Sequence, residues 1–126
     1  VKLRRTWRLG DVVEAEFGPT VKMHELDHYV AFTRGPVALA RDTRFDDGPI
    51  DEAIGWRKLK QAPVFTPTRV LKGGMWMAFS ASLPLGSHQE NPDGATPTTV
   101  RFCDYASAGA LWQPNNAYRV WIPVEY

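Results

Sequence analysis

Two short apolar runs joined by a Gly-Pro pair constrain the fold of this chain more than any other stretch. They occupy residues 29–42, with the sequence YVAFTRGPVALARD. Both runs are apolar on both faces, which predicts a strand covered on both sides, near the centre of the molecule. Because Pro36 cannot donate a ladder hydrogen bond, Gly35-Pro36 predicts a bulge or a bend where the strand changes partners or sheets. An ordinary hairpin turn is the alternative.

Period-two alternation of apolar residues recurs along the rest of the chain. It predicts strands at residues 12–17, 20–24, 98–103 and 118–124, and a basic edge strand at 1–5. In the first of these, Glu14 and Glu16 form a solvated face, not a catalytic carboxylate pair. In the predicted strand at 98–103, Val100 and Phe102 are expected to point inward.

Breaker residues mark the connections. Residues 43–67 predict a long surface excursion, with a turn at 46–49 and one or two helical turns over 51–59 capped by Asp51. A hairpin around Gly73-Gly74 is predicted to join arms at 69–71 and 75–83. A second long loop is expected at 84–97, and residues 104–109 read as a small-residue turn.

These patterns predict an all-β fold: a two-sheet antiparallel β-sandwich, jelly-roll-like, with about seven to nine strands and long loops. Ten prolines and ten glycines spread through 126 residues argue against long helices. A chain of this length is expected to form a single domain, residues 1–126, with a usable core. It begins at Val1 without a methionine, as expected of a piece of a longer protein, a processed product or a chain freed from a tag.

Charge and cysteine usage exclude some classes of partner. The formal net charge is +1, and the charged residues are scattered, so neither a nucleic acid nor a membrane partner is expected. No signal peptide or long apolar span is apparent. The lone Cys103 cannot form an internal disulfide, and it leaves the cellular compartment undetermined.

Three segments, in order along the chain, resemble the non-catalytic β-sandwich part of glycoside hydrolase family 127, the β-L-arabinofuranosidase family. Residues 5–13 (RTWRLGDVV) are similar to that family's R-x-W-x-x-G-D entry to a strand. Residues 31–40 (AFTRGPVALA) are similar to its A-x-x-R-G-P strand. Residues 104–109 (DYASAG), followed by 118–123 (YRVWIP), resemble its closing turn and V-W-L-P strand.

The resemblance implies an accessory role. In that family the active site lies in a separate N-terminal (α/α)6 barrel, with a cysteine nucleophile, a glutamate and a cysteine-rich zinc site. Cys103 falls in no matching catalytic motif, so no catalytic residue carries over. The resemblance therefore implies a non-catalytic β-sandwich domain of a larger glycoside hydrolase, with the catalytic barrel as its partner.

Candidate sites from the residues themselves are few. His24, His28, His88 and Cys103 lack the spacing of a zinc site, and the acidic residues between 42 and 51 do not match a calcium loop, so neither a metal nor a cofactor is predicted. No nucleophile–base set is apparent, which argues against a small independent enzyme.

Loop tryptophans are the remaining candidates. Trp56 and Trp112 could stack on sugar rings, so a free-standing carbohydrate-binding module is the alternative function. Capping of the core, or packing against a neighbouring domain, is the structural interpretation of the same residues. A homodimer is a further expected partner state, because an accessory domain exposes an apolar patch.

Overall fold

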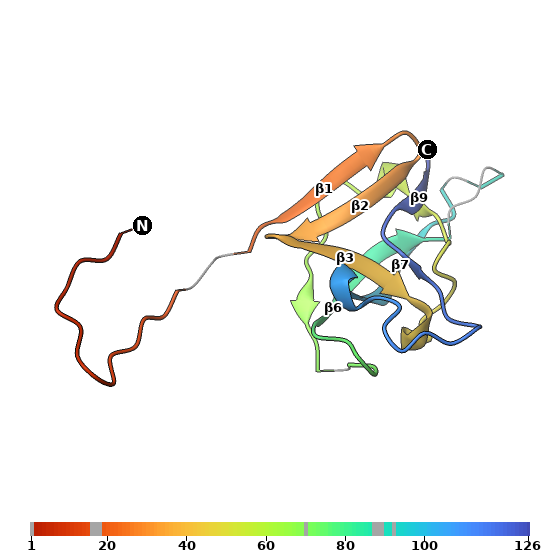
Figure 1. Cartoon of the computed structure of the whole chain (residues 1–126). Coiled ribbons are helices and arrows are strands. Elements are labelled where there is room, and N and C mark those ends of the chain that lie inside the picture. The colour runs from red at the N-terminus through yellow and green to blue at the C-terminus, as the bar shows by residue number, and fades with distance from the viewer. Residues whose placement is uncertain (1, 16–18, 70, 87–89, 92) are drawn as a thin grey trace.

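The computed structural model is all-β, and it describes residues 2–15, 19–69, 71–86, 90–91 and 93–126 (Figure 1). Over these residues the strands are β1 (Val21–Leu26), β2 (Tyr29–Arg34), β3 (Val37–Asp42), β4 (Ile54–Gly55), β5 (Thr66–Pro67), β6 (Ala78–Leu85), β7 (Thr96–Asp104), β8 (Tyr118–Arg119) and β9 (Ile122–Glu125). Three 3-10 helices join them in the same part of the chain: η1 (Thr43–Phe45), η2 (Trp56–Lys58) and η3 (Tyr105–Ser107). The prediction of an all-β fold with seven to nine strands and long loops is confirmed.

The strands form two layers that pack in a sandwich-like manner. β1, β2 and β9 make one layer, and β3, β7, β6 and β4 make the other, with β5 paired to β6. The layers are joined at both sides, because β2 also pairs with β3 and β9 also pairs with β4. Among the described strands, β4–β9 is the one parallel pairing. Hydrogen bonding therefore continues around a closed ring, and β1 lies outside the ring, paired with β2.

An aromatic cluster fills the space between the layers. The ring centroids of Phe32 and Phe102 are 6.0 Å apart, and Phe65 lies 5.5 Å from the first and 5.1 Å from the second. Val100 lies beside them in the same core. The inward orientation predicted for Val100 and Phe102 is confirmed, since both are fully buried. Edge-to-face contacts of this kind add to the burial of apolar area.

Both alternatives for residues 29–42 contribute to the observed geometry. β2 and β3 form a tight turn at Gly35-Pro36, and Gly35 has a φ of +57°, a conformation that glycine adopts without strain. The two strands pair only at Thr33 with Ala38 and Arg34 with Val37. β3 then crosses to the other layer and pairs with β7. The stretch is a short hairpin and also the point where the chain changes sheets.

The predicted surface excursion over 43–67 is largely wrong, because it contributes three large residues to the core. Phe45, Ile54 and Phe65 are all buried. The expected helical segment is reduced to η2, whose N-cap is Gly55, and Asp51 does not cap it. Apolar residues spaced too far apart to form a periodic pattern thus anchor this segment.

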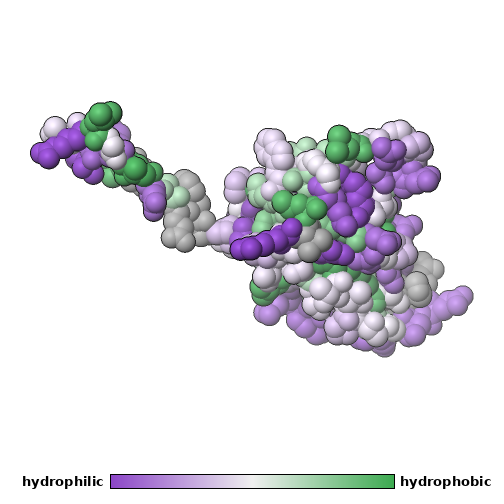
Figure 2. Space-filling view, turned by 90° about the horizontal axis from the view of Figure 1, so that it is seen from below, coloured by the Kyte–Doolittle hydropathy of each residue, from purple (hydrophilic) through white to green (hydrophobic). Residues whose placement is uncertain are grey.

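Residues 2–15 form an extended arm that leaves the body beside the β2–β3 turn (Figure 1). The strands predicted at 1–5 and 12–17 are wrong where the structure describes them; residues 1, 16 and 17 lie outside the described part. A strand needs a hydrogen-bonding neighbour, and the arm has none among the described strands. Seen from below, the arm carries hydrophobic and hydrophilic residues side by side, apart from the body (Figure 2).

Two element boundaries also differ from prediction. The hairpin around Gly73-Gly74 has β5 and β6 as its arms, so residues 69 and 71 are not in a strand; residue 70 lies outside the described part. The predicted last strand, 118–124, is broken at Val120 and Trp121 into β8 and β9. The break occurs because β8 pairs with β3 while β9 pairs with β2 and β4.

We expect Phe102→Ala to lower the free energy of unfolding by about 3–5 kcal/mol, because it empties the centre of the aromatic cluster. Thr99→Ala, at an exposed position of the same strand, is the matched control and should change it by less than about 0.5 kcal/mol. Urea unfolding followed by tryptophan fluorescence measures both. Equal losses for the two variants would contradict the assignment of the core.

Candidate functional site

A buried ion pair at the end of β3 holds three separate segments together. The Arg44 guanidinium donates to both carboxylate oxygens of Asp42, with Nε–Oδ1 at 2.9 Å and Nη2–Oδ2 at 2.8 Å. Its remaining N–H groups donate to the carbonyl oxygens of Ser107 and Ala110, at 3.2 and 2.7 Å, and to that of Gly73. We call this set the polar clamp. It ties the loop after η3 and the turn before β6 to the sheet.

The electrostatics of the clamp favour the ionised carboxylate. Burial of Asp42 opposes its ionisation, but hydrogen bonds from the Arg44 side chain, from the Arg44 N–H and from the Gly109 N–H outweigh that cost. The pKa of Asp42 is therefore lowered, and that of Arg44 is raised by the same pairing. Bidentate charge-assisted bonds of this kind are among the strongest in proteins.

A second carboxylate positions the residues that precede β6. Asp104 ends β7 and caps η3, accepting a hydrogen bond from the Ser107 N–H at 3.1 Å. Its other oxygen accepts from the Met77 N–H at 3.1 Å, and the Ser107 hydroxyl accepts from the Trp76 N–H at 3.3 Å. The small-residue turn predicted at 104–109 is confirmed as η3, and it also fixes the backbone of Trp76 and Met77.

These contacts present an exposed apolar surface, which we call the apolar end. It consists of Leu71, Trp76, Met77, Tyr105 and Leu111, and Trp76 is 78% exposed. Two adjoining hollows of about 320 and 430 Å³ both include Trp76 and Met77 in their walls. Apolar surface gathered in this way marks an interaction site more often than isolated exposed residues do.

Close packing of two loops shapes this surface. Gly74 has a φ of +77°, and a Cβ atom there would lie 2.9 Å from the Cβ of Ala110. At Gly73 an added Cβ would lie 3.0 Å from Cδ1 of Leu111. The Gly-Gly turn thus lets the loop after η3 approach closely, which places Leu111 beside the segment that carries Trp76.

The structure does not bring Trp56 and Trp112 together. Trp56 begins η2, is partly buried against the main core, and lies 6.2 Å from the ring of Tyr126. Trp112 is 64% exposed and follows Leu111 in the loop that packs on the Gly73-Gly74 turn. The two residues have different neighbours, and no contact in the described part of the chain joins them into one sugar-binding platform. Their role as carbohydrate-binding residues stays a prediction.

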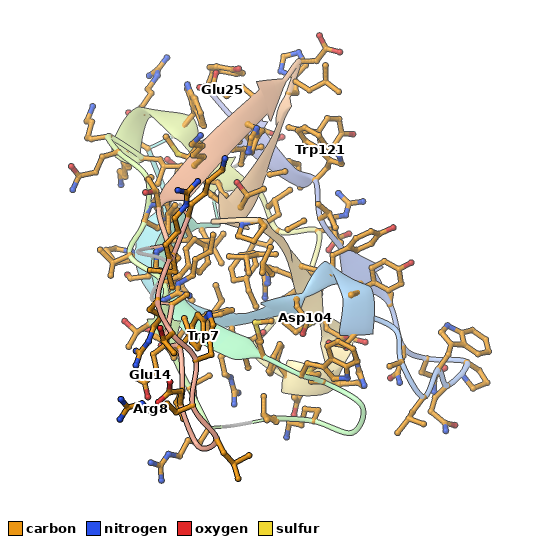
Figure 3. The ribbon with its side chains drawn as sticks, turned by 60° about the vertical axis from the view of Figure 1, so that its left-hand side comes forward. Trp7, Arg8, Glu14, Glu25, Asp104 and Trp121 are labelled. Atoms are coloured by element: carbon orange, nitrogen blue, oxygen red, sulfur yellow. The ribbon has the colours of Figure 1, made fainter. Side chains whose placement is uncertain are left out.

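Trp76 is a member of the apolar end that was not among the predicted site residues. This residue lies between the Gly-Gly turn and β6, and it is exposed together with Met77, whereas Met75 is buried. A large aromatic residue on the outward face was the available signal. Trp121 directly precedes β9, which pairs with β2, and Figure 3 shows it well away from Asp104, so it is not part of the apolar end.

The potential metal ligands are engaged elsewhere. His24 Nε2 lies 2.9 Å from the Thr33 hydroxyl, and the His28 ring packs edge-on to Tyr126. Asp47 accepts hydrogen bonds from Arg41 and from the Arg101 N–H. No cluster of three or more His, Cys, Asp or Glu side chains occurs among the described residues, and His88 lies outside them.

Cys103 is fully buried on β7. Burial, with smaller contributions from the charges of Asp42 and Asp104, raises its pKa to about 12. The side chain is therefore a thiol at neutral pH, not the thiolate that nucleophilic catalysis needs.

Comparison of the chain with protein-family models, with curated proteins and with solved structures finds no match. In the part of the chain that the structure describes, no helix is long and apolar enough to cross a membrane.

Asp42→Asn should lower the free energy of unfolding at pH 7 by about 3–5 kcal/mol, because it leaves Arg44 buried without its counter-ion. The pKa of Asp42 lies below its ordinary 3.8 in the folded chain, so its stabilisation is complete above that pH and is lost as the pH falls through the folded value. The difference between the two proteins should therefore shrink below pH 4. Urea titrations at several pH values measure it, with exposed Asp51→Asn as the control; a pH-independent difference would contradict the pairing.

The Cys103 thiol should resist modification in the native protein. A thiol with a pKa near 12 and no exposed surface reacts only when the sheet opens. Labelling with a thiol reagent at pH 7.5 should be slow without denaturant and rapid in urea. Fast native labelling would contradict the burial.

Proposed function

We propose that the chain is a non-catalytic accessory β-sandwich domain whose apolar end packs against a larger partner. The partner expected from the family resemblance is the (α/α)6 catalytic barrel of a β-L-arabinofuranosidase-like glycoside hydrolase. The observation that carries the proposal is the apolar end itself. Its largest member, Trp76, is 78% exposed yet held on a backbone tied to Asp104 and Ser107.

Three features of the residues favour a docking role. The surface joins two hollows, as a receptor for protruding side chains would. The carboxylates of Asp42 and Asp104 beneath it accept hydrogen bonds from Arg44 and Ser107, which stabilises the loops that carry the surface. The segment DYASAG, which carries part of the resemblance, builds η3 and one wall of the surface.

An accessory role also fits the chemistry of the buried thiol and of the two carboxylates near the apolar end. Cys103 is a buried thiol, and the carboxylates of Asp42 and Asp104 accept hydrogen bonds from neighbouring backbone and side-chain groups. A general acid or base must reach its substrate, and a carboxylate held in this way does not.

A carbohydrate-binding module is the second candidate, and one observation favours it. Trp76 and Trp112 both present open aromatic surface, and their loops meet at the Gly73-Gly74 turn. Aromatic faces of this kind stack on sugar rings. The two functions differ in the partner, so one pair of titrations separates them.

The test is binding of the full chain to a purified (α/α)6 barrel of the β-L-arabinofuranosidase family, measured by calorimetry. We expect binding that Trp76→Ser weakens by about tenfold or more, as loss of a central anchor does. Val64→Ser, an equally exposed apolar position outside the apolar end, is the matched control and should bind like the wild type.

The same proteins are titrated with arabinan, xylan and cellulose oligosaccharides while tryptophan fluorescence is followed. The accessory role predicts no saturable change. Saturable sugar binding that Trp76→Ala, Trp112→Ala or Trp56→Ala abolishes, without binding to the barrel, would favour the carbohydrate-binding module.

A further inference from the structure

β1 presents an unpaired edge. It pairs with β2 along its whole length, from Val21–Arg34 to Leu26–Tyr29, and no other described strand lies beside it. Val21 and Met23 are half-buried against the main core, while Lys22 and His24 face solvent. Unpaired N–H and C=O groups along such an edge accept a further strand of matching pattern.

Residues 12–15 of the arm have the matching pattern. Val13 and Ala15 alternate with Glu14, and Val12 and Val13 are largely exposed in the structure. Arm residues Trp7, Arg8 and Glu14 are labelled in Figure 3, as is Glu25 near the end of β1. Residues 12–15 therefore have a strand pattern without a neighbouring described strand, and β1 has an edge without one.

We infer that residues 12–15 pair antiparallel with β1 of a second copy of this chain. Placing Glu14 opposite His24 puts Ala15 opposite Met23 and Val13 opposite Glu25 on one side of the strand pair, and Val12 opposite Leu26 on the other. The negative Glu14 then lies directly opposite His24 and diagonal to the basic Lys22. A slip of one residue would turn Glu14 toward the core, so the hydrophobic pattern limits the register to shifts of two residues, and cross-linking distinguishes these registers.

The chain beside β1 directs the arm away from its own edge. The Gly35 N–H donates to the carbonyl oxygen of Thr20 at 2.9 Å, and Pro19 lies against Gly35. This contact holds the chain on the β2–β3 turn, and the arm continues outward from there (Figure 1). A second copy can receive the arm without breaking the contact, and reciprocal exchange closes a two-fold dimer.

Disulfide trapping between two different variants tests this inference. Glu14→Cys and His24→Cys chains are mixed and oxidised, then separated on a non-reducing gel; buried Cys103 gives little background. Directly opposite residues have Cα atoms roughly 4.5–5.5 Å apart, within reach of a disulfide, whereas the diagonal Glu14→Cys with Lys22→Cys control is roughly 7–8 Å apart. We expect about tenfold more cross-linked heterodimer from the first mixture than from the control.

Three results would overturn the inference. The first is absence of cross-linked heterodimer; the second is equal or stronger cross-linking of the control mixture. The third is an intrachain disulfide in a monomeric chain carrying both Glu14→Cys and His24→Cys, which would place the arm on its own β1. Barrel binding through the apolar end is measured separately, and none of these results bears on it.

Discussion

The ion pair between Asp42 and Arg44 is the constraint on which the functional surface depends. Asp42 ends a strand that crosses between the two layers, so its carboxylate is fixed by the sheet. Arg44 extends that fixed point to carbonyl groups at positions 73, 107 and 110. Without Arg44, the buried Asp42 carboxylate would lose its counter-ion and the part-buried carbonyl groups of residues 107 and 110 would lose these donors, at a cost of several kcal/mol. The hydrogen bonds of the polar clamp therefore fix the two loops that carry the apolar end.

Local sequence signals predicted the strands whose neighbours the pattern itself specifies. Val100 and Phe102 alternate in a strand with one buried face, and their orientation followed from that alternation. Residues 29–42 carried two signals, an apolar strand and a breaker pair, and both are expressed in the fold. Such features depend on a few adjacent residues, so they can be predicted from the sequence alone.

Features that depend on distant partners were not predictable. Arg44 lies in a stretch that reads as a loop, and its contacts are 29 to 66 residues away. The closure of the two layers depends on β4, two residues long, pairing with β9. The arm shows the converse: Val13 and Ala15 alternate as a strand does, but no described strand lies beside them. Trp56 and Trp112 looked alike as loop aromatics, and tertiary packing separates them.

The central claim is that the polar clamp organises the apolar end as one preformed surface. Amide hydrogen exchange of Arg44→Lys, compared with the wild type, tests it most directly, because lysine keeps the charge but cannot bridge the same carbonyl groups. We predict faster exchange in residues 74–77 and 107–111 together, with β6 and β7 still protected. Unchanged exchange in both loops, or equal acceleration throughout the sheet, would contradict the claim.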